Sequence, residues 1–174
     1  MKTIIIVIAL TLVGLTAFGF VNQVITQPMI DPAGSLEQGD MRQVAISGEV
    51  IQPGTYAVSE YATLGDLVEA AEGLTGNADR LAFDLEYVLK GDEYYIAPLY
   101  DHSDVCATTP IVKTNINEAD AEELKEVAGF NKTVAAEIVS YRASNPFGAI
   151  EELLDVTGIG PATFASTRDK VTIK

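Results

Sequence analysis

The chain has 174 residues, a formal net charge of −14 and 48% hydrophobic residues, enough for one medium domain or two small domains with an apolar segment. Its single cysteine, Cys106, excludes an intrachain disulfide. One cysteine and one histidine also fall short of the three or four such ligands that common zinc sites use, so no metal site is expected.

The N-terminal segment is apolar. Residues 4–21, "IIIVIALTLVGLTAFGFV", carry no charge and would form a helix of roughly 27 Å, close to the thickness of the bilayer hydrocarbon core. We therefore predict a transmembrane anchor over residues 4–25. The alternatives are a cleaved signal peptide, for which "TAFG" is a poor cleavage site, and a buried core helix. Lys2 is the only charged side chain in this segment, which predicts a single-pass cell-membrane protein with a cytoplasmic N-terminus and extracytoplasmic soluble domains.

A linker is predicted over residues 26–42 and a small domain over residues 43–100. "VAISGEVIQPGTYAVS" has the apolar alternation of two short strands around the turn "QPGT". In "TLGDLVEAAEGL", Thr63 is a candidate N-cap with Asp66 three residues later, and Gly73 is expected to end the helix. "LKGDEYYIAP" is expected to close the domain as a hairpin turn and an exposed edge strand.

Four stretches of this domain resemble the soluble-ligand-binding β-grasp family: "SGEVIQPGTY", "LGDLVEAAEGLT", "NAD" and "LKGDEYYIAP". The resemblance implies a non-catalytic domain that binds a glycan-like ligand or a protein partner in an extracytoplasmic setting. A folded spacer that lifts the next domain off the membrane is the alternative.

Residues 101–112 are predicted to be a second linker. Its stretch "YDHSDVC" is interpreted as polar linker, and the alternative is a metal-binding cluster of Asp101, His102, Asp104 and Cys106. The balance of acidic and basic residues changes at this linker. Fifteen acidic and three basic residues lie between positions 31 and 109, against ten acidic and seven basic residues from position 110 onward. The C-terminal part is therefore close to balanced.

Residues 113–174 contain an internal repeat. Residues 122–138, "EELKEVAGFNKTVAAEI", align with residues 151–167, "EELLDVTGIGPATFAST". Each copy predicts a short helix, a tight glycine turn and a second helix, and "SNPFGA" joins the copies. Asp120 and Glu123 are expected to form a capping box for the first helix.

With "TNINEADAEELKEV" and "IVSYRASNPFGAIEEL", these paired helix-hairpin-helix motifs resemble the ComEA family along nearly the whole chain. The resemblance implies a membrane-anchored, non-enzymatic receptor for double-stranded DNA in DNA uptake, competence and transformation, with DNA-uptake channel proteins as further partners. It implies an α+β fold class: an N-terminal transmembrane helix, a small β-grasp domain and an all-α tandem helix-hairpin-helix domain.

The second hairpin, "TGIGPATF", has the features of a phosphate-binding turn. Glycines allow the backbone to approach a phosphate closely, and Pro161 suits the first helical turn because it has no N–H to satisfy. Free N–H groups at the helix start are expected to bind phosphate oxygens without reading base edges. The predicted DNA-binding residues here are Gly158, Ile159, Gly160, Ala162 and Thr163.

The first hairpin, "AGFNKTVA", departs from this pattern. Asparagine replaces the second glycine and is expected to keep the turn because it tolerates left-handed backbone, while lysine replaces proline. The predicted DNA-binding residues here are Gly129, Phe130, Asn131, Lys132 and Thr133.

Nearby cations decide whether an acidic chain can hold a polyanion. Ala162 stands where such motifs often carry lysine, which leaves Arg168, Lys170 and Lys174 as nearby cations. Of these, Arg168 and Lys170 are further predicted DNA contacts. We expect Lys132, Arg142, Arg168 and Lys170 to make the hairpin face neutral or positive.

The alternative function is envelope scaffolding, in which the hairpins bind protein and the β-grasp domain binds a glycan. No nucleophile–base pair is visible, so no enzyme is expected. No cofactor is expected, with a monovalent cation at a hairpin as the alternative.

Overall fold

A computed structural model of the protein describes residues 40–101 and 108–174, which belong to one compact unit, Gly39–Lys174. The anchor predicted at residues 4–25 lies outside the described residues, as do His102, Asp104 and Cys106. Within the described part of the chain, no helix has the length and apolar character needed to cross a bilayer. The same residues contain no cluster of three or more histidine, cysteine, aspartate or glutamate side chains suited to a metal ion.

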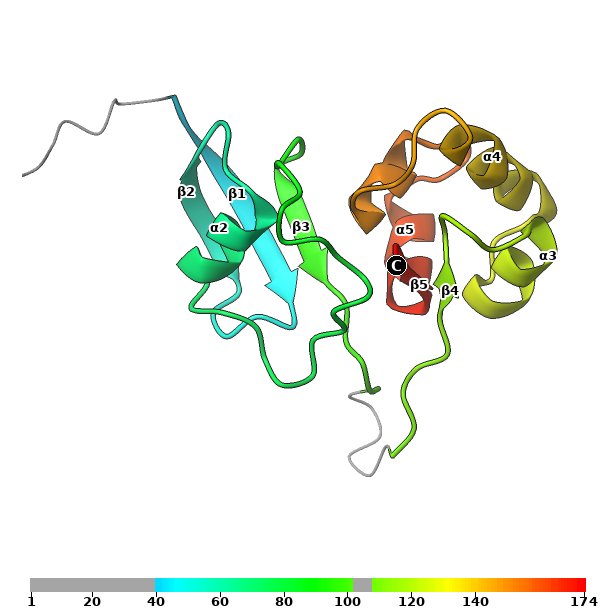
Figure 1. Cartoon of the computed structure of the whole chain (residues 1–174), viewed down its shortest axis with the longest axis horizontal. Helices are drawn as coiled ribbons and strands as arrows, with labels where there is room; N and C mark the ends of the chain where they lie inside the picture. The colour runs from blue at the N-terminus through cyan, green and yellow to red at the C-terminus, as the bar shows by residue number, and fades with distance from the viewer. Residues whose placement is uncertain (1–39, 102–107) are drawn as a thin grey trace, which may run out of the picture. The chain divides into compact units, whose positions relative to one another are not determined.

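The first domain is a three-stranded sheet with one helix. Figure 1 shows β1 (Met41–Gly48) between β2 (Gly54–Ser59) and β3 (Glu93–Ile96), with α2 (Leu64–Ala70) beside the sheet. The strands β1 and β2 pair antiparallel across the predicted turn, whereas β3 pairs parallel with β1. The predicted hairpin turn before β3 is therefore wrong, because a parallel partner must be reached by a crossover, here through α2 and the following loop. The predicted edge position of β3 is confirmed.

Helix α2 starts as the sequence predicts. The Thr63 hydroxyl accepts the Asp66 N–H, and the Asp66 carboxylate accepts the Thr63 N–H at 2.7 Å, which completes the capping box. The helix ends at Ala70, and Gly73 follows in the left-handed conformation, with φ 104°. The apolar face of α2 lies in a core that it shares with the sheet: Val44, Ile46, Val58, Leu64, Leu67, Val68, Tyr94 and Ile96.

The described residues contain a sheet and helices, so the predicted α+β class is confirmed for them. The second domain is mainly helical but not all-α as predicted, because it contains a short pair of strands. Strand β4 (Thr114–Asn115) pairs parallel with β5 (Val171–Thr172). The first copy of the repeat contains α3 (Ala121–Glu123), the short π-helix η1 (Leu124–Ala128) and α4 (Lys132–Arg142). The second copy contains the 3₁₀ helix η2 (Ile150–Asp155) and α5 (Pro161–Thr167), which leads into the 3₁₀ helix η3 (Arg168–Lys170).

The repeat detected in the sequence is a repeat of structure. Leu124 and Leu153, which align, are both fully buried in the core of this domain. Gly129 and Gly158, which also align, both have left-handed backbone, with φ 83° and 93°. The predicted capping box at Asp120 is only half formed, because the Glu123 side chain accepts from the Thr114 hydroxyl instead.

Replacing the two left-handed glycines by alanine is expected to destabilise the protein by different amounts. An L-residue in this conformation costs ~1–2 kcal/mol. A Cβ at Gly158 would lie 3.1 Å from Val134 Cγ2, whereas a Cβ at Gly129 would meet nothing within 4 Å. Urea unfolding should therefore show a larger loss for Gly158→Ala than for Gly129→Ala. Equal losses would contradict the contact between Gly158 and Val134.

Candidate nucleic-acid interface

The two hairpin turns lie against each other. Gly158, in the second turn, packs on Val134, the third residue of α4 in the first hairpin. Phe130 and Ile159 occupy corresponding positions of the two turns, and their side chains are buried in one common core, with 3% and 6% exposure. The starts of α4 and α5 are therefore held together by the packing of the two turns.

At the start of α5, three N–H groups have no acceptor among the described residues. The first helical hydrogen bond runs from Phe164 N–H to the Gly160 carbonyl, at 2.9 Å, and no side chain caps the helix. Within the described residues, the N–H groups of Gly160, Ala162 and Thr163 therefore have no hydrogen-bond partner. The Ile159 N–H is not free as expected, because it donates to the Val156 carbonyl at 3.1 Å inside the turn.

The first hairpin uses two of its N–H groups to close its turn. Gly129 N–H and Phe130 N–H both donate to the Leu124 carbonyl, which closes the turn. The Asn131 side chain caps α4 by accepting the Val134 N–H at 2.9 Å. Asn131, Lys132 and Thr133 keep N–H groups for which the described structure shows no acceptor. The two turns thus share a backbone shape and differ in how the helix start is satisfied.

The position of Asn131 and Gly160 does not need a left-handed residue, contrary to the sequence-based interpretation. Both are N-cap residues with extended backbone: φ is −72° at Asn131 and −104° at Gly160. A Cβ at Gly160 would meet nothing within 4 Å. The left-handed role belongs to the first glycine of each turn, and the second position accepts a capping side chain.

The predicted cationic face is smaller than expected. The Arg142 guanidinium is used inside the domain, where it donates to the carbonyls of Ile116 at 2.8 Å and Glu118 at 3.3 Å. Arg168 stacks on the Tyr95 ring, 3.6 Å from its centroid. Both arginines contact their own chain, which the spacing of charges along the sequence does not indicate.

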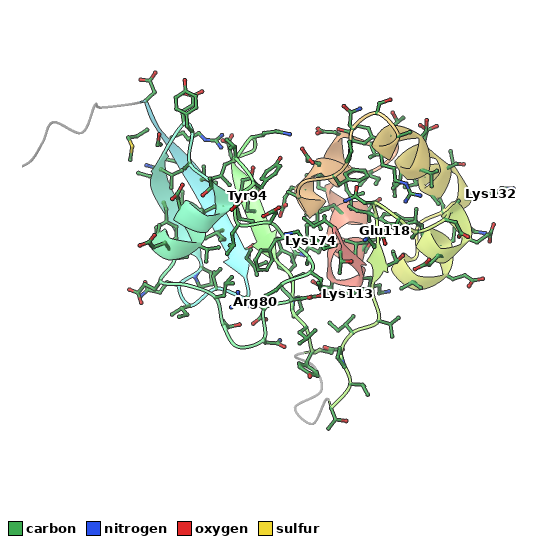
Figure 2. All side chains as sticks on the ribbon, in the orientation of Figure 1. Arg80, Tyr94, Lys113, Glu118, Lys132 and Lys174 are labelled. Carbon is green, nitrogen blue, oxygen red and sulfur yellow. The ribbon has the colours of Figure 1, made fainter. Side chains whose placement is uncertain are left out.

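Two of the predicted cations remain available. Lys132 and Lys170 are exposed, and no ion pair or hydrogen bond of their side chains is found among the described residues. Figure 2 shows Lys132 at the edge of the helical domain, at the start of α4. Its ammonium group and its backbone N–H therefore belong to the same helix start.

Asn117 is a structural residue that the sequence analysis missed. Its side chain accepts the Phe147 N–H at 2.8 Å and donates to the carbonyls of Phe147 and Ile173, both at 3.0 Å. It thereby connects the segment before α3, the link between the two hairpins and the C-terminal strand. No local pattern marks such a residue, because its partners lie 30 and 56 positions away.

Comparisons with known proteins agree with this architecture. The helix-hairpin-helix motif matches residues 109–172, and the SLBB domain matches residues 43–97. The chain is 28% identical over 153 residues to ComE operon protein 1 of Bacillus subtilis (strain 168), covering 82% of this chain and 75% of that protein. It is also 43% identical over 61 residues to an uncharacterized protein of Haemophilus influenzae, covering 34% of this chain and 54% of that protein.

Proposed function

Since this chain belongs to the ComEA family, we propose that it is a non-enzymatic receptor that binds double-stranded DNA without sequence preference, in DNA uptake for competence. The observation that carries the proposal is the packing of Gly158 against the first turn of α4. It holds together two helix starts with six N–H groups that have no acceptor among the described residues, on Asn131, Lys132, Thr133, Gly160, Ala162 and Thr163.

The chemistry of this surface favours phosphate over bases. Backbone N–H groups at a helix start bind anionic oxygens and carry no donor–acceptor code for a base pair. Lys132 and Lys170 supply the only side-chain cations of the predicted set that have no partner in the described residues. With so few cations, we expect weak binding, with a Kd of about 10⁻⁴–10⁻⁶ M at physiological salt, as for other non-specific contacts.

The proposed setting is the outer face of the cell membrane. It is supported by the uncharged stretch at residues 4–21 and by Lys2, and the proposed anchor would place both folded domains outside the cytoplasm. DNA-uptake channel proteins are proposed as further partners. Salt screens the acidic charge of the chain beyond about 8–10 Å, so the local hairpin surface governs affinity.

Titration with a short duplex at several salt concentrations tests the proposal. DNA binding through phosphates predicts an affinity that falls steeply with salt and does not depend on the sequence of the duplex. The rival function, protein scaffolding by the hairpins, is favoured by the engagement of Arg142 and Arg168 within the chain. Absence of measurable binding at 50 mM salt would support that rival.

A further inference from the structure

The second hairpin makes charged contacts with the β-grasp domain. The Glu151 carboxylate accepts the backbone N–H of Tyr95 at 2.7 Å, on the strand β3 that has no other strand beyond it. The neighbouring Glu152 carboxylate accepts from the Tyr87 hydroxyl at 3.0 Å and pairs with the Lys90 ammonium at 2.6 Å. Two adjacent carboxylates of η2 thus satisfy donors of the other domain.

A second group of contacts comes from η3. The Tyr95 hydroxyl donates to the Asp169 carboxylate at 2.7 Å, and the Arg168 guanidinium lies over the same ring. Tyr95 is therefore held at its backbone, its ring and its hydroxyl by three residues of the second hairpin.

Small residues bring the two domains close. Ala149 is 1% exposed and belongs to the core of the β-grasp domain, although it lies in the link between the hairpins. A Cβ at Gly148 would lie only 2.7 Å from the Tyr87 ring. The small side chains at Gly148 and Ala149 therefore allow the second copy to approach the β-grasp domain closely.

The first copy of the repeat lacks these contacts. Its aligned carboxylates stay within the helical domain: Glu122 pairs with Lys125 at 2.6 Å, and Glu123 accepts from the Thr114 hydroxyl at 2.9 Å. The Glu-Glu pair therefore contacts its own domain in the first copy and the β-grasp domain in the second copy.

We propose that the β-grasp domain binds the second hairpin of its own chain through Tyr87, Lys90 and Tyr95. The two domains then move as one body, and the Tyr95 N–H on the outer edge of β3 is not free to bind an external ligand. This contact also reduces the usual hazard of an unpaired strand edge. The role of the β-grasp domain is to fix the position of the hairpins, and it does not depend on whether they bind DNA.

The protonation of Glu151 makes this contact sensitive to pH. Burial raises the pKa of the Glu151 carboxyl to about 7, which Glu152 reinforces, while hydrogen bonding from the Tyr95 N–H and the charge of Arg168 act in the opposite direction. The titratable and charged groups around the carboxyl are Glu152 on η2, Arg168 on η3, and Glu93, Tyr94 and Tyr95 on β3.

The folded state therefore favours protonated Glu151 more than the unfolded state does, where the pKa is 4.5. The stabilisation is complete below pH 4.5 and is lost as the pH rises through 7. Between pH 5 and pH 8, the urea midpoint of the natural protein should fall relative to that of Glu151→Gln, which cannot ionise. If the urea midpoints of the two proteins differ by a constant amount from pH 5 to pH 8, the raised pKa of Glu151 is contradicted.

A matched pair of charge reversals tests the docking itself. Lys90→Glu places a carboxylate opposite Glu152, and Lys125→Glu makes the same change at the other 2.6 Å lysine–glutamate pair, within the first copy. ¹⁵N relaxation measured on Gly39–Lys174 gives a separate rotational correlation time for each domain. We expect equal correlation times in the natural protein and in Lys125→Glu, and loss of common tumbling in Lys90→Glu.

A steric pair provides the second test. Gly148→Val would force the Tyr87 ring away, whereas Gly76→Val has open space around it. Only Gly148→Val should separate the tumbling of the domains, with hairpin amide shifts retained. Independent tumbling in the natural protein, or common tumbling in both Lys90→Glu and Gly148→Val, would overturn the proposal.

Discussion

Gly160→Asp is expected to weaken binding to duplex DNA by about tenfold or more, since a like charge at hydrogen-bond range of a phosphate costs well over the ~1.4 kcal/mol that a tenfold change represents. Gly160→Asn is expected to weaken it by no more than about threefold, because the new side chain would accept one backbone N–H that could otherwise bind phosphate. The pair has nearly identical shape and differs in charge, so the difference in affinity reports how close the phosphate lies to this residue.

Both substitutions are compatible with the fold. Gly160 has extended backbone and open space for a Cβ, and Asn131 occupies the equivalent position of the first hairpin as an N-cap. Either side chain would accept the Thr163 N–H, as Asn131 accepts that of Val134, so stability should rise by a few tenths of a kcal/mol. Fluorescence anisotropy with a labelled duplex measures the affinities, and urea unfolding checks the stabilities. Equal affinities of the two variants would show that the phosphate lies elsewhere.

Asn117→Ala is expected to destabilise the protein by ~2–4 kcal/mol, because it removes three hydrogen bonds and leaves backbone groups of Phe147 and Ile173 without partners. The residue joins segments that lie far apart in sequence, so the loss should appear as a lower urea midpoint for the helical domain.

Asn145→Ala is the matched control for this change. Asn145 is exposed, and in the described structure its side chain makes no hydrogen bond, so its replacement should cost less than about 0.5 kcal/mol. A similar loss of unfolding free energy in the two variants would show that the hydrogen bonds of Asn117 do not stabilise the helical domain.

Local signals in the sequence predicted much of the fold. The Thr63–Asp66 capping box, the turn between β1 and β2, and the two tight glycine turns depend on neighbours within four residues. The repeat was visible because both copies bury the same positions, such as Leu124 and Leu153. The direction of β3 was missed because strand pairing is decided by a crossover and not by the strand itself.

The site was predicted less completely, because its details depend on long-range contacts. Which N–H groups remain free depends on the turn geometry, which uses those of Phe130 and Ile159 internally. Which cations remain free depends on partners such as the Ile116 carbonyl for Arg142 and the Tyr95 ring for Arg168. Neither follows from spacing along the chain.

The central claim is that specific backbone N–H groups of the paired hairpins contact DNA phosphates. The most direct test is an amide chemical-shift titration of ¹⁵N-labelled protein with a short duplex at low salt. We expect the largest shifts at Asn131, Lys132, Thr133, Gly160, Ala162 and Thr163, and small shifts at the internally bonded amides of Phe130, Val134 and Ile159. Shifts concentrated on the β-grasp domain, or no shifts in either hairpin, would contradict the claim.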